Sequence, residues 1–221
     1  MHNKTFSFIS CVNDNEMYNE CLKFINNLNV PNGYSIEYIK IENAKSMTSG
    51  YNEGISKATG KYKIYLHQDV LIINKNFLLD ILDVFKDERI GLIGVAGAQN
   101  MPPNGIWWES RMPYNHIYHN AYNGNLVKNE YGTSHKKIIN AEAIDGLIMI
   151  TQYDVKWRDD IFCGWHFYDV SQVQEYSKFG YKTVILNNKE ADVIHDCGIT
   201  WTSSDEEYEK YRKIFLKEYN I

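Results

Sequence analysis

The residue best suited by type and position to a chemical role is Asp69. It follows an apolar strand predicted to begin at residues 63–66. Ligands of open α/β sheets bind beyond the carboxyl ends of the strands, and a carboxylate there can hold a hard divalent cation that bridges to a diphosphate. Asp69 is therefore a candidate metal ligand. In the structural alternative, Asp69 caps the next element and His67 is a hydrogen-bonded core histidine.

A second carboxylate, Asp169, precedes an apolar segment that predicts a helix over residues 170–179, ended by Gly180. The N-terminus of a helix favours the ionised carboxylate, which suits a group that must accept a proton near neutral pH. Asp is also a common N-cap residue, so a purely structural role is open at this point.

The cysteines are few and widely spaced, which argues against a disulfide scaffold and predicts reduced thiols. They are Cys11, Cys21, Cys163 and Cys197. A zinc site could combine Cys163 and His166 with His195 and Cys197, but these spacings match no common zinc knuckle. The first residues lack the apolar segment and cleavage site of a secretory signal, so we expect a cytoplasmic protein.

Alternating strand and helix patterns position these residues, as is typical of a parallel α/β sheet. Apolar runs predict strands at 6–12, 34–41, 63–66, 90–95, 143–150 and 182–186, and helical spacing predicts helices at about 17–28, 46–58, 77–85, 170–179 and 204–219. Ser204 and Glu207 have capping-box spacing at the last helix. The segment from about 97 to 140 lacks a clear period and is predicted to be an irregular, functional excursion.

Composition excludes several classes of protein. The chain has 221 residues, of which 44% are hydrophobic and 14% aromatic, with a net charge of -5. It lacks the composition of a disordered or collagen-like chain, and it contains no run of about 18 apolar residues that could span a membrane. The mild acidity provides no field that would attract nucleic acid.

The run from residue 50 to residue 70 carries a family resemblance. Asn52, Gly54, Ala58 and Gly60 fit an Asn-x-Gly-x-x-x-Ala-x-Gly helix that leads into an apolar strand ending at Asp69. The chain thereby resembles the family 2 glycosyltransferases, nucleotide-sugar enzymes of GT-A fold, over residues 7–198. The tetrad at 67–70, His-Gln-Asp-Val, looks closest to a glycosyltransferase-like branch in which it replaces Asp-x-Asp.

The resemblance implies an α/β GT-A fold, with a mainly parallel nucleotide-binding sheet flanked by helices and an irregular acceptor-side region. It implies a single domain over residues 1–221. About residues 1–97 would bind the nucleotide sugar, about 98–200 would form the acceptor side, and 204–219 would form the C-terminal helix.

The resemblance also implies roles for individual residues. Asp169 corresponds to the catalytic base, with Tyr168 in place of the usual preceding acid. Asp69 and His195 correspond to the metal site, and this mixed N/O set suits Mn or Mg. His67 stands where the family has its first Asp, which leaves one carboxylate instead of two. A hydrogen-bonded surface histidine is the alternative for His195.

Binding residues follow by position in the motifs. The donor-binding candidates are Cys11, Asn13, Asp14, Glu42, Asn43, Asn52, His67 and Gln68. The acceptor-binding candidates are Asp145, Gly146, Trp107, Trp108, Trp165 and His166. For the two tryptophans at 107 and 108, sugar stacking and ordinary packing are both open.

The resemblance thus implies a metal-dependent, inverting glycosyltransferase that moves a sugar from a nucleoside diphosphate sugar, UDP-sugar favoured, to a saccharide or other hydroxyl acceptor. A non-catalytic nucleotide-sugar or glycan-binding protein is the alternative, motivated by His67. Nucleotidyl transfer is disfavoured because no Gly-rich phosphate loop follows the first strand. We expect no nucleic-acid partner; a homo-oligomer and a place at the periphery of a membrane glycan pathway are left open.

Overall fold

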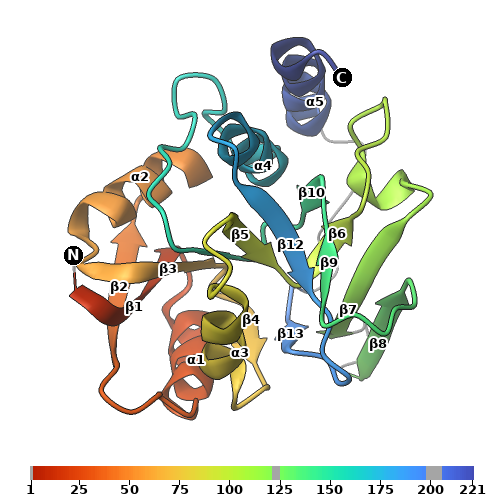
Figure 1. Cartoon of the computed structure of the whole chain (residues 1–221). Coiled ribbons are helices and arrows are strands. Elements are labelled where there is room, and N and C mark those ends of the chain that lie inside the picture. The colour runs from red at the N-terminus through yellow and green to blue at the C-terminus, as the bar shows by residue number, and fades with distance from the viewer. Residues whose placement is uncertain (1, 121–124, 198–205) are drawn as a thin grey trace.

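The computed structural model describes residues 2–120, 125–197 and 206–221, and it shows an α/β protein (Figure 1). The strands are β1 (His2–Val12), β2 (Ser35–Glu42), β3 (Gly60–Leu66), β4 (Val70–Ile72), β5 (Ile90–Gly94), β6 (Ala96–Ala98), β7 (Pro113–Asn120), β8 (Leu126–Tyr131), β9 (Ile138–Asn140), β10 (Ala143–Ile144), β11 (Ile148–Thr151), β12 (Lys182–Leu186) and β13 (Val193–His195). The helices are α1 (Asn15–Asn26), α2 (Met47–Lys57), α3 (Phe77–Val84), α4 (Tyr168–Lys178), α5 (Glu206–Tyr219) and the short 3-10 helix η1 (Trp107–Glu109).

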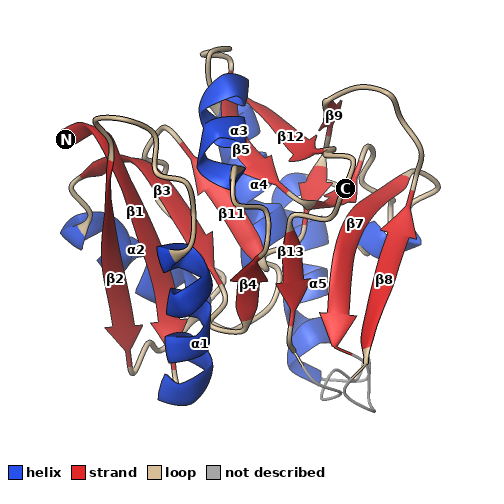
Figure 2. Cartoon of the chain, turned by 90° about the horizontal axis from the view of Figure 1, so that it is seen from below, coloured by secondary structure: helices blue, strands red, loops and turns tan. Residues whose placement is uncertain are grey.

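A seven-stranded sheet in the order β2-β1-β3-β11-β5-β12-β9 forms the centre of the molecule. β1 pairs in parallel with β2 and β3, and β5 pairs in parallel with β12, whereas β11 and β9 are antiparallel to their neighbours. Helices α1 and α3 cover one face, seen from below in Figure 2, and α2 and α4 cover the other. The prediction of a mainly parallel sheet between helices is confirmed.

Local sequence explains how α2 lies against this sheet. Ser46 caps the helix by accepting a hydrogen bond from the backbone of Ser49. A Cβ at Gly54 would collide with the side chain of Ile9 on β1. Asn52 donates to the carbonyl of Trp157 and accepts from its amide, at 3.0 and 2.9 Å. The Asn-x-Gly motif therefore allows close helix–sheet packing and anchors a distant segment.

Part of the region predicted to be irregular, residues 97–140, belongs to a second sheet through β7 and β8, whereas residues 99–112 and 132–137 form no strand. The order of this sheet is β10-β6-β7-β13-β4, with β8 paired to β7. The prediction was wrong for this part because the inward positions of β7 alternate Asn115, Ile117 and His119, so only one of them is apolar and the strand period is hidden. The single strand predicted at 143–150 was also wrong: residues 145–147 form a turn that separates β10 in the second sheet from β11 in the first.

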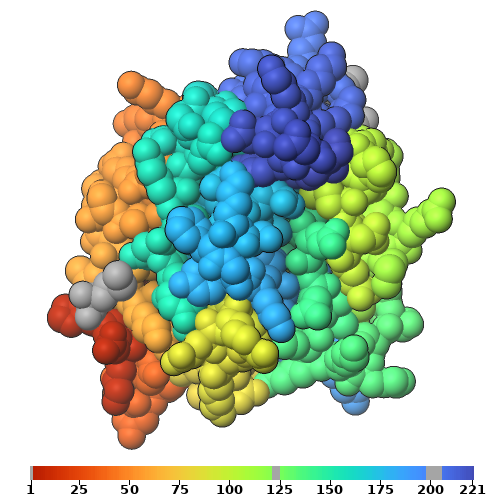
Figure 3. Space-filling model, turned by 45° about the horizontal axis from the view of Figure 1, so that its top comes forward, coloured from red at the N-terminus to blue at the C-terminus, as the bar shows by residue number. Residues whose placement is uncertain are grey.

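The C-terminal helix α5 packs by its aromatic residues. Tyr208, Tyr211 and Phe215 are buried in a cluster with Phe162 and Phe167, which lie just before α4. The space-filling view shows α5, in dark blue, against this segment and against the loop after β6 (Figure 3). The predicted cap Ser204 lies outside the described residues. Among the helices of the described residues, none is long and apolar enough to span a membrane.

Candidate functional site

Asp69 lies in the turn between β3 and β4, with its Oδ1 buried. That atom has no hydrogen-bond partner among the described residues. It lies 3.6 Å from Nε2 of His195 and 4.0 Å from Nδ1 of His67. A buried carboxylate oxygen costs free energy unless it is paired, and one oxygen with two imidazoles is a donor set that a divalent cation accepts. These three residues therefore fit a cation.

The turn that carries Asp69 is fixed from two sides. The amide of Asp196, just after β13, donates to the carbonyl of Asp69 at 2.9 Å, which brings His195 to the turn. The amide of His67 donates to the carbonyl of Leu147 at 3.0 Å. Hydrogen bonds between backbone groups thus bring the segments at 67–69, 145–147 and 195–196 together.

His67 is held by Tyr168, the first residue of α4. Its Nε2 lies 2.5 Å from the Tyr168 hydroxyl. Burial lowers the pKa of His67, so the neutral ring predominates near pH 7. Gly146 allows the contact, because a Cβ there would overlap the Tyr168 hydroxyl. The pair joins the segment that carries Asp69 to the first turn of α4.

Asp169 follows in the first turn of α4 and is held by two backbone amides. Its Oδ2 accepts from Gly146 at 3.0 Å and its Oδ1 from Val170 at 2.8 Å. Burial raises its pKa to about 7, and the charge of Asp145 adds to the shift, whereas the two amides oppose it. Burial therefore outweighs the helix terminus, which alone predicted an ordinary ionised carboxylate.

The residue before α4 has a strained backbone. Phe167 has a φ of 61°, in the left-handed region that a bulky side chain rarely adopts, and its ring is buried against Tyr208 and Phe215 of α5. Such strain persists only where surrounding packing enforces it. The contact with α5 thus holds the chain at the point where Tyr168 and Asp169 begin the helix.

His195 lies between two groups that attract its proton. Burial alone would lower its pKa, but a hydrogen bond with Cys197 and the charge of Asp69 raise it to about 9. Hydrogen bonds from His119 and His195 lower the pKa of Cys197 to about 6. Cation binding at His195 must displace a proton, so cation affinity rises with pH.

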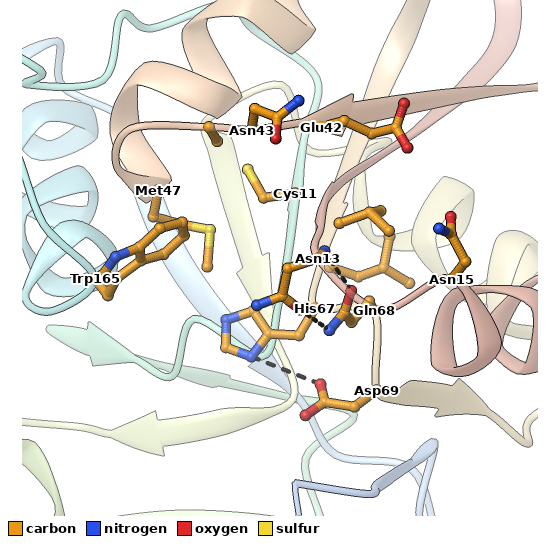
Figure 4. Close-up of a pocket in the computed structure, with 13 residues that line it drawn as sticks. Cys11, Asn13, Asn15, Glu42, Asn43, Met47, His67, Gln68, Asp69 and Trp165 are labelled. Carbon is orange, nitrogen blue, oxygen red and sulfur yellow. Dashed lines mark hydrogen bonds and ion pairs between the residues drawn. The ribbon is translucent and has the colours of Figure 1, made fainter.

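A cavity of about 460 Å³ opens beside the Asp69 turn. Met47 and Trp165 face it from one side, and Asn15 and Glu42 from the other (Figure 4). Of the predicted donor-binding residues, Cys11, Asn13, Glu42, Asn43, His67 and Gln68 line it, together with Asp69. Trp165, predicted on the acceptor side, lines this cavity too; nothing in the sequence distinguished its two possible places.

The Gln68 amide holds the cavity wall. Its Oε1 accepts from the amides of Asn13 and Asp14 at 2.9 and 3.0 Å, and its Nε2 donates to Oδ1 of Asn13 at 2.5 Å. Two predicted donor residues lie outside the lining. Asp14 caps α1 through the amides of Glu16 and Met17, and Asn52 holds Trp157, so both have structural roles here.

The predicted acceptor residues divide into two groups. Asp145 and Gly146 lie in the turn beside Asp169, and Asp145 accepts a hydrogen bond from Leu147 at 2.9 Å. His166 and Trp108 both pack against Tyr208 of α5, with ring centroids 5.5 and 5.8 Å away. Trp107 instead is partly buried and packs against two hydrophobic clusters.

The zinc site considered from sequence does not form as proposed. The potential ligand atoms that gather around His195 belong to His67 and Asp69 on one side and to His119 and Cys197 on the other. Cys163 and His166 belong to neither group. Sequence reasoning missed His119 because its strand was not predicted.

Comparisons with known proteins agree with this geometry. A family model described as "Glycosyltransferase like family" matches residues 7–219. No curated protein matches the chain in sequence.

Solved structures match at low identity. Mannosyltransferase PcManGT from Pyrobaculum calidifontis, in complex with GDP-Man and Mn²⁺, aligns with a TM-score of 0.55 and 9% identity over 96% of this chain and 61% of that one. S. aureus TarS 1-349 aligns with a TM-score of 0.53 and 11% identity over 87% and 60%. GalNAc-T7 with UDP, GalNAc and Mn²⁺ aligns with a TM-score of 0.63 and 12% identity over 98% and 50%. The chain therefore spans 50 to 61% of these structures, and the likeness confirms the GT-A fold.

Proposed function

Because the chain belongs to the glycosyltransferase-like family, whose model matches residues 7–219, we propose that it transfers a sugar from a nucleoside diphosphate sugar to a hydroxyl acceptor. One observation carries the proposal. The Asp69 turn and the Asp169 carboxylate are joined through residues 145–147, since His67 donates to Leu147 and Gly146 donates to Asp169. A candidate cation ligand and a candidate base thus share one short hydrogen-bonded framework.

The donor nucleotide occupies the cavity beside Asp69 in this proposal. Amide, carboxylate and backbone groups from the ends of β1 and β2 line the cavity, where open α/β sheets bind ligands. Asp69 and His195 would hold Mn²⁺ or Mg²⁺, and such a cation neutralises charge that develops on a leaving diphosphate. UDP-sugar is our first choice of donor. The neighbouring structures contain GDP-Man in one case and UDP in another, so both bases need testing.

Asp169 removes the proton from the acceptor hydroxyl. A pKa of about 7 places the carboxyl near the pH at which a general base is most effective. The amides of Gly146 and Val170 orient both of its oxygens. The acceptor oxygen then attacks the anomeric carbon opposite the diphosphate, the C–O bond to the diphosphate breaks, and the configuration inverts.

The acceptor enters beside Trp165, His166 and Trp108 in this proposal. Trp165 is 45% exposed and Trp108 40%, so both rings keep a surface that a sugar ring can cover. Asp145, in the turn beside Asp169, would accept a hydrogen bond from an acceptor hydroxyl in this proposal.

The test is a donor screen in two steps. UDP-, GDP- and CMP-sugars are added with and without Mn²⁺, and the shift in melting temperature identifies the donor. Release of nucleoside diphosphate is then measured with a saccharide acceptor. Metal-dependent release supports the enzyme, and Asp169→Asn serves as the inactive control. Binding without release, at every acceptor tried, contradicts the proposal and favours a binding protein.

A further inference from the structure

A second group of potential ligands lies on the other side of His195. The ligand atoms of His119, His195 and Cys197 all lie within 4.8 Å of one another. His119 and His195 are partners in the parallel pairing of β7 with β13, and their ring centroids are 5.7 Å apart. The sheet register itself therefore places two imidazoles side by side.

Hydrogen bonds fix the chain that brings Cys197 to these rings. Nδ2 of Asn120, at the end of β7, donates to Oδ1 of Asp196 at 2.6 Å. The amide of Asp196 donates to the carbonyl of Asp69. Asp196 is thereby held by the side chain of Asn120 and by the backbone of Asp69, and Cys197 follows it directly. His119 and His195 lie on paired strands, and Cys197 lies two residues beyond β13, next to the hydrogen-bonded Asp196.

We propose that His119, His195 and Cys197 bind a thiophilic divalent cation of the Zn²⁺ class. One thiolate and two imidazoles are a ligand set that Zn²⁺ takes with a fourth position left for water or another ligand. Mg²⁺ and Mn²⁺ prefer oxygen and so favour the Asp69 side of His195. The two sides differ in chemistry: a carboxylate and His67 on one, a thiol and His119 on the other.

Sharing of His195 has a consequence for both sides. Both groups include its imidazole, so a cation on the thiol side competes for it with a cation on the Asp69 side. The inference goes beyond sugar transfer and is tested with metal alone. A failure of the transferase proposal and a failure of this one are therefore distinguishable.

Cobalt spectroscopy tests the site. Co²⁺ replaces Zn²⁺ in such sites and gives a thiolate-to-cobalt charge-transfer absorption. We expect this band when Co²⁺ is added to the full chain freed of metal by a chelator, and its loss on addition of Zn²⁺. Cys197→Ser should abolish the band. Asp69→Asn should retain it, which separates the two sides of His195, and Cys163→Ser is the matched control because Cys163 is exposed and outside the group.

An alkylation assay uses the unchanged chain, so it needs no folded variant. Zn²⁺ should slow reaction of Cys197 with iodoacetamide by about tenfold or more, because the thiolate is the nucleophile, and should leave Cys163 unaffected. Mass spectrometry of the modified peptides reports both residues in one sample. The proposal is overturned if cobalt binds without the charge-transfer band or if the band persists in Cys197→Ser. It is also overturned if Zn²⁺ does not change the rate of Cys197 alkylation.

Discussion

The two carboxylates at the centre of the site, Asp69 and Asp169, lie in opposite surroundings. Asp69 faces the imidazoles of His67 and His195, and its buried oxygen has no hydrogen-bond partner among the described residues. Asp169 has two amide donors and a neighbouring carboxylate, Asp145, and burial raises its pKa to about 7.

This difference separates two kinds of chemistry. A carboxylate beside imidazole nitrogens, with a free oxygen, suits a cation and the diphosphate that the cation neutralises. A carboxylate that is desolvated and repelled by another carboxylate holds a proton near neutral pH, which suits proton transfer. The predictions below test whether the two residues can be separated in this way.

Asp169→Asn should have the largest effect. Removal of a positioned general base typically lowers turnover about 10²- to 10⁴-fold. Donor binding, measured as the melting-temperature shift with nucleotide sugar and Mn²⁺, should stay near the wild-type value because Asp169 does not line the donor cavity. Turnover at the wild-type rate in this variant would show that Asp169 does not act as a base and has only a structural role in α4.

Asp69→Asn should give the converse result. Asp69 is the one carboxylate in the group with His67 and His195. Its loss should weaken Mn²⁺ binding by about tenfold or more, because loss of a residue that only hydrogen-bonds to a metal ligand already has an effect of this size. The melting-temperature shift with donor plus Mn²⁺ should shrink, and Asp80→Asn, remote from the cavity lining, is the control. An equal loss of Mn²⁺ affinity in Asp169→Asn would contradict the separation.

Stability should depend on pH through Asp169. Its folded pKa of about 7 exceeds the ordinary value of 3.8, so the folded state binds a proton more tightly and loses stability as pH rises between these values. Asp169→Asn removes this loss. Relative to wild type, the variant should gain roughly 1 to 3 kcal/mol of unfolding free energy between about pH 4 and 8, the full shift being reduced by partial exposure. Urea unfolding at several pH values measures the difference, and a constant difference contradicts the assigned pKa.

Tyr168→Phe should have the smallest effect. It removes only the hydroxyl bonded to Nε2 of His67. A hydrogen bond contributes about 0.5 to 1.5 kcal/mol net, so the rate should fall about 2- to 10-fold. Tyr176→Phe is the matched control. Tyr176 lies near the C-terminal end of α4, and its hydroxyl donates to the carbonyl of Tyr153. Equal rate losses in both variants would mean a general effect on the helix.

The first half of the chain, up to about residue 97, was predictable because its patterns are regular. Apolar strands such as 90–95 and the helix from Ser46 follow directly from apolar runs and a capping residue. The same segments position Asp69: β3 ends at Leu66, three residues before the predicted strand end, and Asp69 follows in the turn before β4. The motif that carried the resemblance, however, serves packing in the structure. Asn52 donates a hydrogen bond to the carbonyl of Trp157, and the lack of a Cβ at Gly54 leaves room for the side chain of Ile9.

The second sheet was not predictable from its local pattern. In β7, Asn115 and His119 point to the side where a sequence pattern requires apolar residues. A polar residue at such a position predicts a loop, although here His119 belongs to a group of potential metal ligands. The turn at 145–147 was hidden for the opposite reason, because apolar residues continue on both sides of it. Long-range pairing decides both cases.

The pH dependence of kcat/KM tests the central claim most directly, that the half-buried carboxylate of Asp169 acts as the base. With donor and acceptor at fixed Mn²⁺, wild-type activity should rise to a plateau with a midpoint near the pKa of about 7. Asp145→Asn keeps an oxygen for the Leu147 amide but removes the repelling charge, so the midpoint should move to lower pH. A profile that is flat from about pH 5.5 to 8.5, or the same midpoint in Asp145→Asn, would contradict the account.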